Sequence, residues 1–140
     1  MAALEQYLGK KYKLKSSENF EEFLKFLNIG LLSRKAATSV SPVACLVKNE
    51  DGSYTFTLNT VIRNSVLTFR LDEEFEEDRL DGVKVKSTVV LDGDQVIHTQ
   101  VESNGRKSCH VRIFTPTTLT VTTTAEEWDG KCVRIYEIME

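Results

Sequence analysis

Asp–Gly and Asn–Gly dipeptides recur along this chain, and they constrain its fold more than any other feature. Five of the seven glycines directly follow Asp or Asn. Both residue types tolerate the positive φ angles of the tight turns between right-twisted strands, and so the dipeptide is the strongest short signal for a β-hairpin. The predicted hairpin turns are Asp51-Gly52, Asp81-Gly82, Asp92-Gly93, Asn104-Gly105 and Asp129-Gly130.

The segments between these turns have the pattern of short strands. Two segments are too long for one strand each, and weaker breaks divide them at residues 62–64, 71–73 and 115–117. Eight turns therefore join nine strands, and Tyr12 and Leu14 indicate one more near the start. Apolar residues alternate with polar ones along the strands, which predicts a sheet with one face toward an interior. The predicted inward positions include Tyr54, Phe56, Leu58, Leu67, Phe69, Leu71, Val83, Val85, Val89, Leu91, Leu119 and Val121.

A helical pattern follows the first predicted strand. Apolar residues take helical spacing at Phe20, Phe23, Leu24 and Leu27. We expect Ser17 to be the N-cap of this helix, because a side-chain oxygen at this position accepts a bond from a free backbone N–H.

A second short helix is expected directly after the first. Gly30 is expected to stop the first helix, and the second is predicted over 31–39, before Pro42. The two helices together are short enough to cover one end of a sheet protein.

Ten short strands joined mostly by hairpins favour a closed barrel, because closure removes the exposed edges that promote aggregation. A barrel of this kind encloses more space than its inward side chains fill, and so we expect a ligand cavity. The predicted fold is a single domain over residues 1–140, a mainly β, ten-stranded antiparallel up-and-down barrel capped by a two-helix lid.

Composition and charge exclude several classes of function. The net charge of -3 gives no attraction to nucleic-acid phosphates. No apolar run is long enough for a signal peptide or a membrane span. Cys45, Cys109 and Cys132 form no CxxC pair and cannot all pair with one another. We therefore expect a cytoplasmic monomer with no nucleic-acid partner, and the sequence leaves open whether it also enters the nucleus.

Two arginines are the candidate chemical groups. Arg134 and Tyr136 share one face of the last predicted strand, while Val133 and Ile135 occupy the other, so the pattern does not say which face points inward. Arg112 shares a face with apolar neighbours. The two arginines are either solvated groups on the barrel wall or a buried anion site, in which the fork of arginine donors meets a carboxylate.

No motif indicates an enzyme, a cofactor or a metal. His98 and His110 lack a spaced carboxylate or thiolate partner, and satisfied or exposed strand histidines are the simpler interpretation. The acidic run 72–78 is most simply a solvated turn and strand edge. We find no paired nucleophile and base and no phosphate-binding loop.

Four stretches together resemble the intracellular lipid-binding family, the fatty-acid-binding and cellular retinoic-acid-binding proteins. They are YLGKKYKLKSSENFEEFLKFLNIG (7–30), RKAATSVSP (34–42), FRLDEEFEEDRLDGVKVKSTVVLDGD (69–94) and VRIYE (133–137). The resemblance implies a ten-stranded barrel with a two-helix lid, in which Arg112, Arg134 and Tyr136 hold a ligand carboxylate. The Arg-x-Tyr match is direct, whereas Arg112 aligns only after a one-residue insertion in VESNGRKSCHVRIF.

The function implied is that of a non-enzymatic carrier of one long-chain fatty acid, with a retinoic-acid carrier as the alternative. Phe20 and Ile62 are the other expected ligand contacts, and Ile62 replaces an aromatic residue that family members often have beside the ligand portal. Lys25, Arg34 and Lys35 either solvate the lid or touch anionic membranes. A lipid-converting enzyme and a protein that stacks membranes are the competing classes, which turnover of a lipid ester or aggregation of vesicles would reveal.

Overall fold

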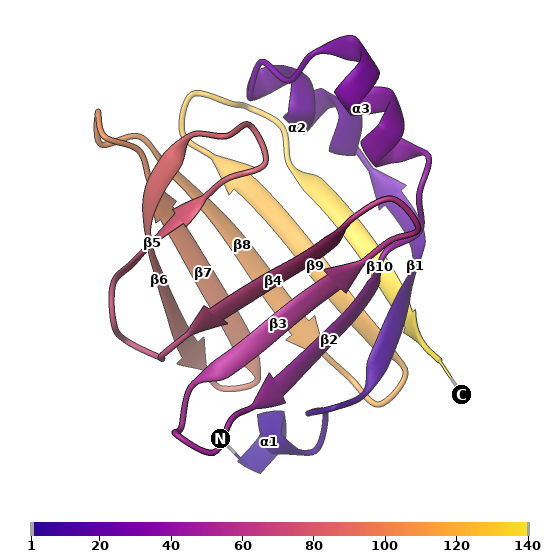
Figure 1. The fold of residues 1–140 in the computed structure, drawn as a ribbon, viewed down its shortest axis with the longest axis vertical. Coiled ribbons are helices and arrows are strands. Elements are labelled where there is room, and N and C mark those ends of the chain that lie inside the picture. Colours follow the sequence, from indigo (N-terminus) through magenta and orange to yellow (C-terminus); the bar gives the residue numbers. More distant parts are fainter. Residues whose placement is uncertain (1, 140) are drawn as a thin grey trace.

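The computed structural model describes residues 2–139, which form ten strands and three short helices (Figure 1). The helices are α1 (Ala2–Glu5), α2 (Phe20–Phe26) and α3 (Leu31–Thr38). The strands are β1 (Lys11–Glu18), β2 (Val43–Lys48), β3 (Tyr54–Asn59), β4 (Asn64–Phe69), β5 (Phe75–Asp78), β6 (Lys84–Asp92), β7 (Gln95–Val101), β8 (Lys107–Phe114), β9 (Thr118–Ala125) and β10 (Cys132–Ile138).

All ten strands belong to one antiparallel sheet in the order β4-β3-β2-β1-β10-β9-β8-β7-β6-β5. Neighbours in sequence pair with each other except β4 and β5, which lie at the two ends of this order. The pairing of β1 with β10 brings the two ends of the chain together and curls the sheet into a nearly closed barrel (Figure 1). The predicted fold class is confirmed.

Strand direction decides which turns lie near the helices. Strand β1 leads into α2, and each paired neighbour runs in the opposite direction. The β3–β4, β5–β6, β7–β8 and β9–β10 turns therefore lie at the helix end of the barrel (Figure 1). We call this end the lid end and the pair α2 and α3 the lid.

The opposite end is filled by the largest apolar cluster. It includes the fully buried Tyr12, Phe114 and Leu119 together with Tyr136. The short helix α1 lies across this end (Figure 1), and its Leu4 is 2% exposed in the same cluster. Sequence patterns did not predict α1, because four residues are too few to show a periodicity.

A second apolar cluster attaches the lid to the barrel. Phe23, Leu24 and Leu27 are buried against Cys132 of β10, as their helical spacing predicted. The ring of Trp128, in the β9–β10 turn, lies 5.4 Å from that of Phe23. The lid is therefore packed on the barrel wall by its apolar face.

Three local predictions were wrong. Ser17 belongs to β1 and does not cap α2; Asn19 occupies the cap position, with a left-handed backbone and no side-chain cap bond. Gly30 does not end α2, because Asn28 already takes the left-handed conformation there, and Gly30 instead precedes α3. Val83 lies before the start of β6 and is 40% exposed, so the alternating pattern does not extend to it.

None of the helices in the described part of the chain is long and apolar enough to cross a membrane. The three cysteines are free thiols.

Candidate functional site

The inward face of β10 carries Arg134 and Tyr136, which are 8% and 3% exposed. Arg112 on β8 pairs in register with Val121 on β9, and Val121 pairs with Arg134. The two arginines thus lie in one row across three strands, with Cα atoms about 10 Å apart from the usual strand spacing. The structure excludes the interpretation of both arginines as solvated groups on the barrel wall.

Arg134 lies where the barrel meets the lid. Its guanidinium carbon is 3.7 Å from the centre of the Phe20 ring, and its Nη1 donates to Oγ of Ser17 at 3.2 Å. The side chain also lines a cleft of about 370 Å³ between β1, β10 and the two lid helices. The structure therefore brings Phe20 and Arg134 together, while their role toward a ligand stays a prediction.

Arg112 lies deeper in the interior. Its guanidinium carbon is 4.5 Å from the centre of the Phe56 ring, and its Nη1 is 3.2 Å from Nδ1 of His98. Burial lowers the pKa of Arg112, and the nearby Tyr136 opposes this effect. Its Nε is buried and has no hydrogen-bond partner among residues 2–139. A buried donor without a partner is costly, and so this nitrogen is a place where a ligand acceptor would gain.

Glu77 is an interior carboxylate that sequence reasoning missed. It accepts hydrogen bonds from Oγ of Ser87, from Nε2 of His98 at 2.6 Å and from Nε2 of Gln100 at 3.1 Å. Burial acts to raise its pKa, but the bonds from His98, Ser87 and Gln100 outweigh burial and lower the pKa to about 2. The carboxylate is therefore ionised, and its position two residues after Phe75, on the inward face of β5, was the signal available in the sequence.

His110 extends this network toward β9. Gln100 donates to Glu77, so its carbonyl oxygen accepts from Oγ of Ser108 and from Nε2 of His110, 3.2 Å away. The other ring nitrogen of His110 lies 2.7 Å from the hydroxyl of Thr123 and accepts its hydrogen. Both histidines are thus satisfied interior groups, one of the two interpretations open from the sequence.

The ionised groups on the inward face of β5 to β10 do not cancel. Among the described residues they are the carboxylate of Glu77 and the guanidinium groups of Arg112 and Arg134. Neutral histidines add nothing, and two positive charges against one negative leave an excess of one positive charge. The interior is electrostatically complementary to one monoanion.

The remaining predicted residues lie outside this row. Ile62 is in the β3–β4 turn at the lid end and is 63% exposed. Lys25 and Lys35 are exposed on the lid helices. The side chain of Arg34 is only 17% exposed, and it donates to the backbone oxygen of Ile29 at 2.8 Å. Its Nε also lies 3.5 Å from Oε2 of Glu21 on α2, so Arg34 links the lid helices and is not a free surface charge.

No three His, Cys, Asp or Glu side chains in the described part of the chain gather closely enough to hold a metal ion.

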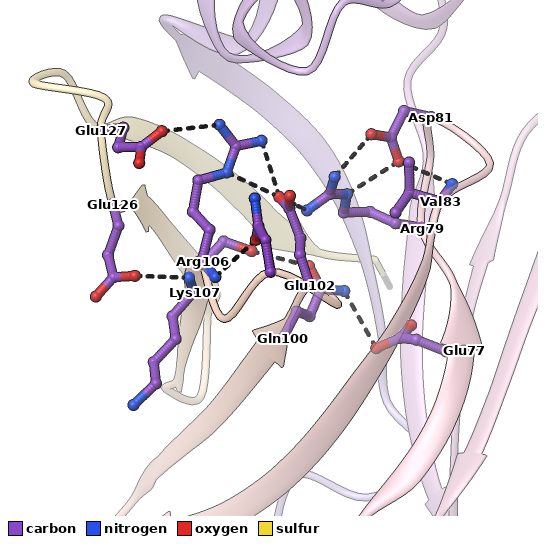
Figure 2. Close-up of polar contacts among 12 residues, drawn as sticks. Glu77, Arg79, Asp81, Val83, Gln100, Glu102, Arg106, Lys107, Glu126 and Glu127 are labelled. Atoms are coloured by element: carbon purple, nitrogen blue, oxygen red, sulfur yellow. Dashed lines mark hydrogen bonds and ion pairs between the residues drawn. The ribbon is translucent and has the colours of Figure 1, made fainter.

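Three turns at the lid end are joined by a second group of charges, which we call the ionic cluster (Figure 2). Arg79 makes a two-pronged contact with Asp81 at 2.9 and 2.7 Å and donates to Glu102 at 2.8 Å. Glu102 also accepts from Arg106, which reaches Glu127 at 3.4 Å. These residues come from the β5–β6, β7–β8 and β9–β10 turns, so the cluster links three separate hairpins to one another.

The ionic cluster also contacts the lid. The guanidinium carbon of Arg106 lies 4.8 Å from the centre of the Phe26 ring on α2, and the Phe26 ring stacks on Trp128 at 6.0 Å. A cation over an aromatic face is attracted by the ring quadrupole. Arg106 therefore connects the turns of the barrel to the helix that covers its open end.

Comparison with known proteins gives a consistent answer, although no family model matches the chain. A fatty-acid-binding protein of Tyrophagus putrescentiae is 41% identical over 117 residues, which cover 84% of this chain and 88% of that protein. The crystal structure of the fatty-acid-binding protein from brain tissue of Drosophila melanogaster superposes with a TM-score of 0.87 and 40% identity over 94% of this chain and 98% of that one. The Schistosoma mansoni fatty acid binding protein in complex with arachidonic acid gives a TM-score of 0.87 at 27% identity over 99% of each chain. The chain belongs to the fatty-acid-binding protein family of intracellular lipid-binding proteins, a family of non-enzymatic carriers.

Proposed function

We propose that this protein carries one long-chain fatty acid inside the barrel, with the carboxylate bound by Arg134, Arg112 and Tyr136. The observation that carries the proposal is the interior row of two arginines with one excess positive charge. The unpartnered Nε of Arg112 supplies a donor for the carboxylate. The arachidonic acid complex of the Schistosoma mansoni relative supports a ligand of this class.

Burial of the hydrocarbon chain provides most of the binding energy. At about 0.8 kcal/mol for each buried methylene, a 16-carbon chain gains roughly 12 kcal/mol before the losses of association. Those losses leave a sub-micromolar dissociation constant as the expected result. Apolar interior residues that keep part of their surface accessible, such as Leu58, Leu67 and Val121, are suitable neighbours for the chain.

A retinoic-acid carrier would use the same three anchoring residues. The two ligands differ in shape and not in headgroup charge, so the anion site does not discriminate between them. Titration with oleate and with retinoic acid decides the matter, and we expect tighter binding of oleate because of the fatty-acid-binding relatives.

The anion site is tested by replacing Arg134 with Gln. The amide keeps polarity but removes the charge, and water only partly substitutes for it in the interior. We expect the affinity for hexadecanoate to fall by about 2–4 kcal/mol, the range for breaking a desolvated charge pair. Calorimetry on hexadecanoate and on hexadecanol, with both proteins, completes the cycle.

Hexadecanol is the control ligand, because it carries no charge for Arg134 to meet. Its affinity for Arg134→Gln should be no lower than for the unaltered protein, since the amide can hydrogen-bond its hydroxyl. Parallel losses for acid and alcohol would mean that Arg134 supports the barrel and does not bind the carboxylate.

Delivery is the remaining part of the proposal. We infer that the protein acts as a monomer in the cytoplasm and releases its ligand at anionic membranes, which it touches with the lid. Exposed Lys25 and Lys35 support this role, whereas Arg34 is engaged within the lid. The ability to enter the nucleus is a separate question that imaging of the tagged protein would answer.

A further inference from the structure

The partners of His98 indicate its protonation state. A carboxylate only accepts, so Nε2 of His98, 2.6 Å from Oε1 of Glu77, carries a hydrogen. A guanidinium only donates, so Nδ1 of His98, 3.2 Å from Nη1 of Arg112, is the acceptor. His98 is therefore a neutral imidazole with its hydrogen on Nε2. Burial lowers its pKa as well, and this effect favours the same neutral form.

Arg112 is held on two sides by these contacts. His98 accepts from one terminal nitrogen, and the ring of Phe56 lies 4.5 Å from the guanidinium carbon. A neutral imidazole fixes the direction of the guanidinium without neutralising it, whereas a directly bound carboxylate would compete with a ligand for the same charge. The charge of Glu77 is kept one side chain away, and Nε of Arg112 has no partner among the described residues.

We propose that His98, oriented by Glu77, is a positioning residue that holds Arg112 in place and leaves its Nε without a competing protein acceptor, so that this N–H can donate to the carboxylate of the ligand. The inference rests on the proposed fatty-acid function of this site. The sequence pattern alone predicts a satisfied or exposed His98 and places Glu77 in a solvated acidic run. In the structure they form one chain of side chains from the edge strand β5 to the anion site.

Two conservative variants separate the two bonds of His98. Gln places an amide N–H near the position of Nε2, so His98→Gln keeps the donor to Glu77 and loses the acceptor for Arg112. Asn places a carbonyl oxygen near the position of Nδ1, so His98→Asn keeps the acceptor and loses the donor. The matched control is His110→Gln, because His110 is the cross-strand partner of His98 and its Nδ1 faces Thr123 instead of Arg112.

Affinities for hexadecanoate and hexadecanol are measured for the four proteins. We expect His98→Gln to weaken hexadecanoate binding about tenfold, the size of one hydrogen bond to a charged group, while hexadecanol binding stays within about twofold. His98→Asn should retain most of the affinity for hexadecanoate. His110→Gln should leave the ratio of the two affinities unchanged.

Nitrogen NMR supplies a readout that a purely structural role would not move. At neutral pH the spectrum of the unaltered protein should show His98 protonated on Nε2 and unprotonated on Nδ1. The Nε–H signal of Arg112 should shift on addition of hexadecanoate and not on addition of hexadecanol, and in His98→Gln this selective shift should be lost.

Two results would overturn the inference: equal losses of acid and alcohol in His98→Gln, or a hydrogen on Nδ1 of His98. Failure of the proposed function is a different result, in which the unaltered protein shows no preference for the acid over the alcohol. The two failures are therefore distinguishable in one set of titrations.

Discussion

Two interior histidines make the fold sensitive to acid. Burial is the main cause that lowers the pKa of both, and the charge of Arg112 adds to this effect in each. Glu77 acts in the opposite direction on His98 and His110 but does not overcome burial. Each histidine is therefore neutral in the folded protein at a pH where the unfolded chain already binds a proton.

We predict that stability falls when the pH decreases below about 6.5, the ordinary histidine value. The sign follows from linkage: a lowered pKa in the folded state means that the unfolded state binds more protons, so acid favours unfolding. Glu77, with a pKa of about 2, adds a further loss between about pH 4.5 and 2. Urea unfolding at pH 7.5, 6.5 and 5.5 measures the first loss.

His110→Gln tests whether the histidines cause the loss of stability in acid. It keeps the donor to Gln100 and cannot take up a proton, so its stability should change less between pH 7.5 and 5.5 than that of the unaltered protein. Identical pH profiles for the two proteins would assign the acid sensitivity to other groups.

The orientation and contacts of single residues were the hardest features to predict from the sequence. The two-residue spacing places Arg134 and Tyr136 on one face of β10. Both faces of this strand carry polar and apolar residues, so composition does not show which face points into the barrel. The pairing of β10 with β1 and β9 decides it. The contacts of Glu77 with His98 and Gln100 join residues more than twenty positions apart, and their register depends on two intervening strand pairings. The residue pattern along one strand does not show its register with strands further along the chain.

At the scale of elements, the ionic cluster connects turns that belong to different hairpins of the sheet. Side chains of Arg79, Asp81 and Glu102 are 5%, 8% and 14% exposed, so these charges are largely removed from water. A buried ion pair contributes little when intact, but removal of one partner leaves the other charge buried and uncompensated.

We therefore predict that Arg79→Ala destabilises the fold by about 3–5 kcal/mol. The control is Arg70→Ala, which breaks an arginine–aspartate pair of similar length, 3.0 Å to Asp51, in which both side chains are exposed. That control should lose far less stability, because water and salt screen an exposed pair. Denaturant unfolding of both variants makes the comparison, and equal losses would contradict the assignment of the cluster as a buried charge group.

The lid is the second element with a testable role. Phe23 is 3% exposed, packs against Cys132 and lies near the rings of Trp128 and His110. The lid covers the barrel end, and the proposed ligand lies in the interior. We therefore predict that Phe23→Ala or Leu27→Ala speeds the release of a fluorescent fatty acid severalfold and changes its equilibrium affinity by less than about twofold. Stopped-flow release measures the rate.

Phe114→Ala is the matched control for this effect. It removes the same ring from the cluster at the opposite end of the barrel. It should reduce stability without selectively accelerating release, since it leaves the lid in place. A release rate of Phe23→Ala equal to that of the unaltered protein would remove the gating role of the lid.

Elements were predicted far better than single contacts, because hairpin turns are local. Asp92-Gly93 and Asn104-Gly105 fix turns within a few residues, and the strands follow from them. The helix boundaries were less well predicted, since Asn19 and Asn28 adopt left-handed backbones that composition does not single out. The missing pairing between β4 and β5 also has no local signal, because it depends on how far the whole sheet curls.

At the scale of the molecule, the two ends of the barrel differ in a way that suits delivery. The end covered by α1 is filled by aromatic and aliphatic core. The lid end exposes large aliphatic side chains, with Leu32 85% and Val61 95% accessible, close to the exposed Lys25 and Lys35. Aliphatic groups beside positive charges are a suitable combination for an anionic lipid surface.

We predict that transfer of a fluorescent fatty acid is faster to anionic than to neutral vesicles, increases with vesicle concentration and weakens as salt is added. The double change Lys25→Ala and Lys35→Ala should abolish the preference for anionic vesicles; Arg34 is left intact because it holds the lid helices together. The matched control changes Lys10 and Lys11, two exposed lysines at the opposite end of β1, to Ala, which alters net charge equally and should preserve the preference. Loss of the preference in both variants would mean that net charge attracts the protein without a defined contact face. Transfer that ignores vesicle charge and concentration would mean that the ligand leaves the barrel in water, and the lid would then serve as a gate alone.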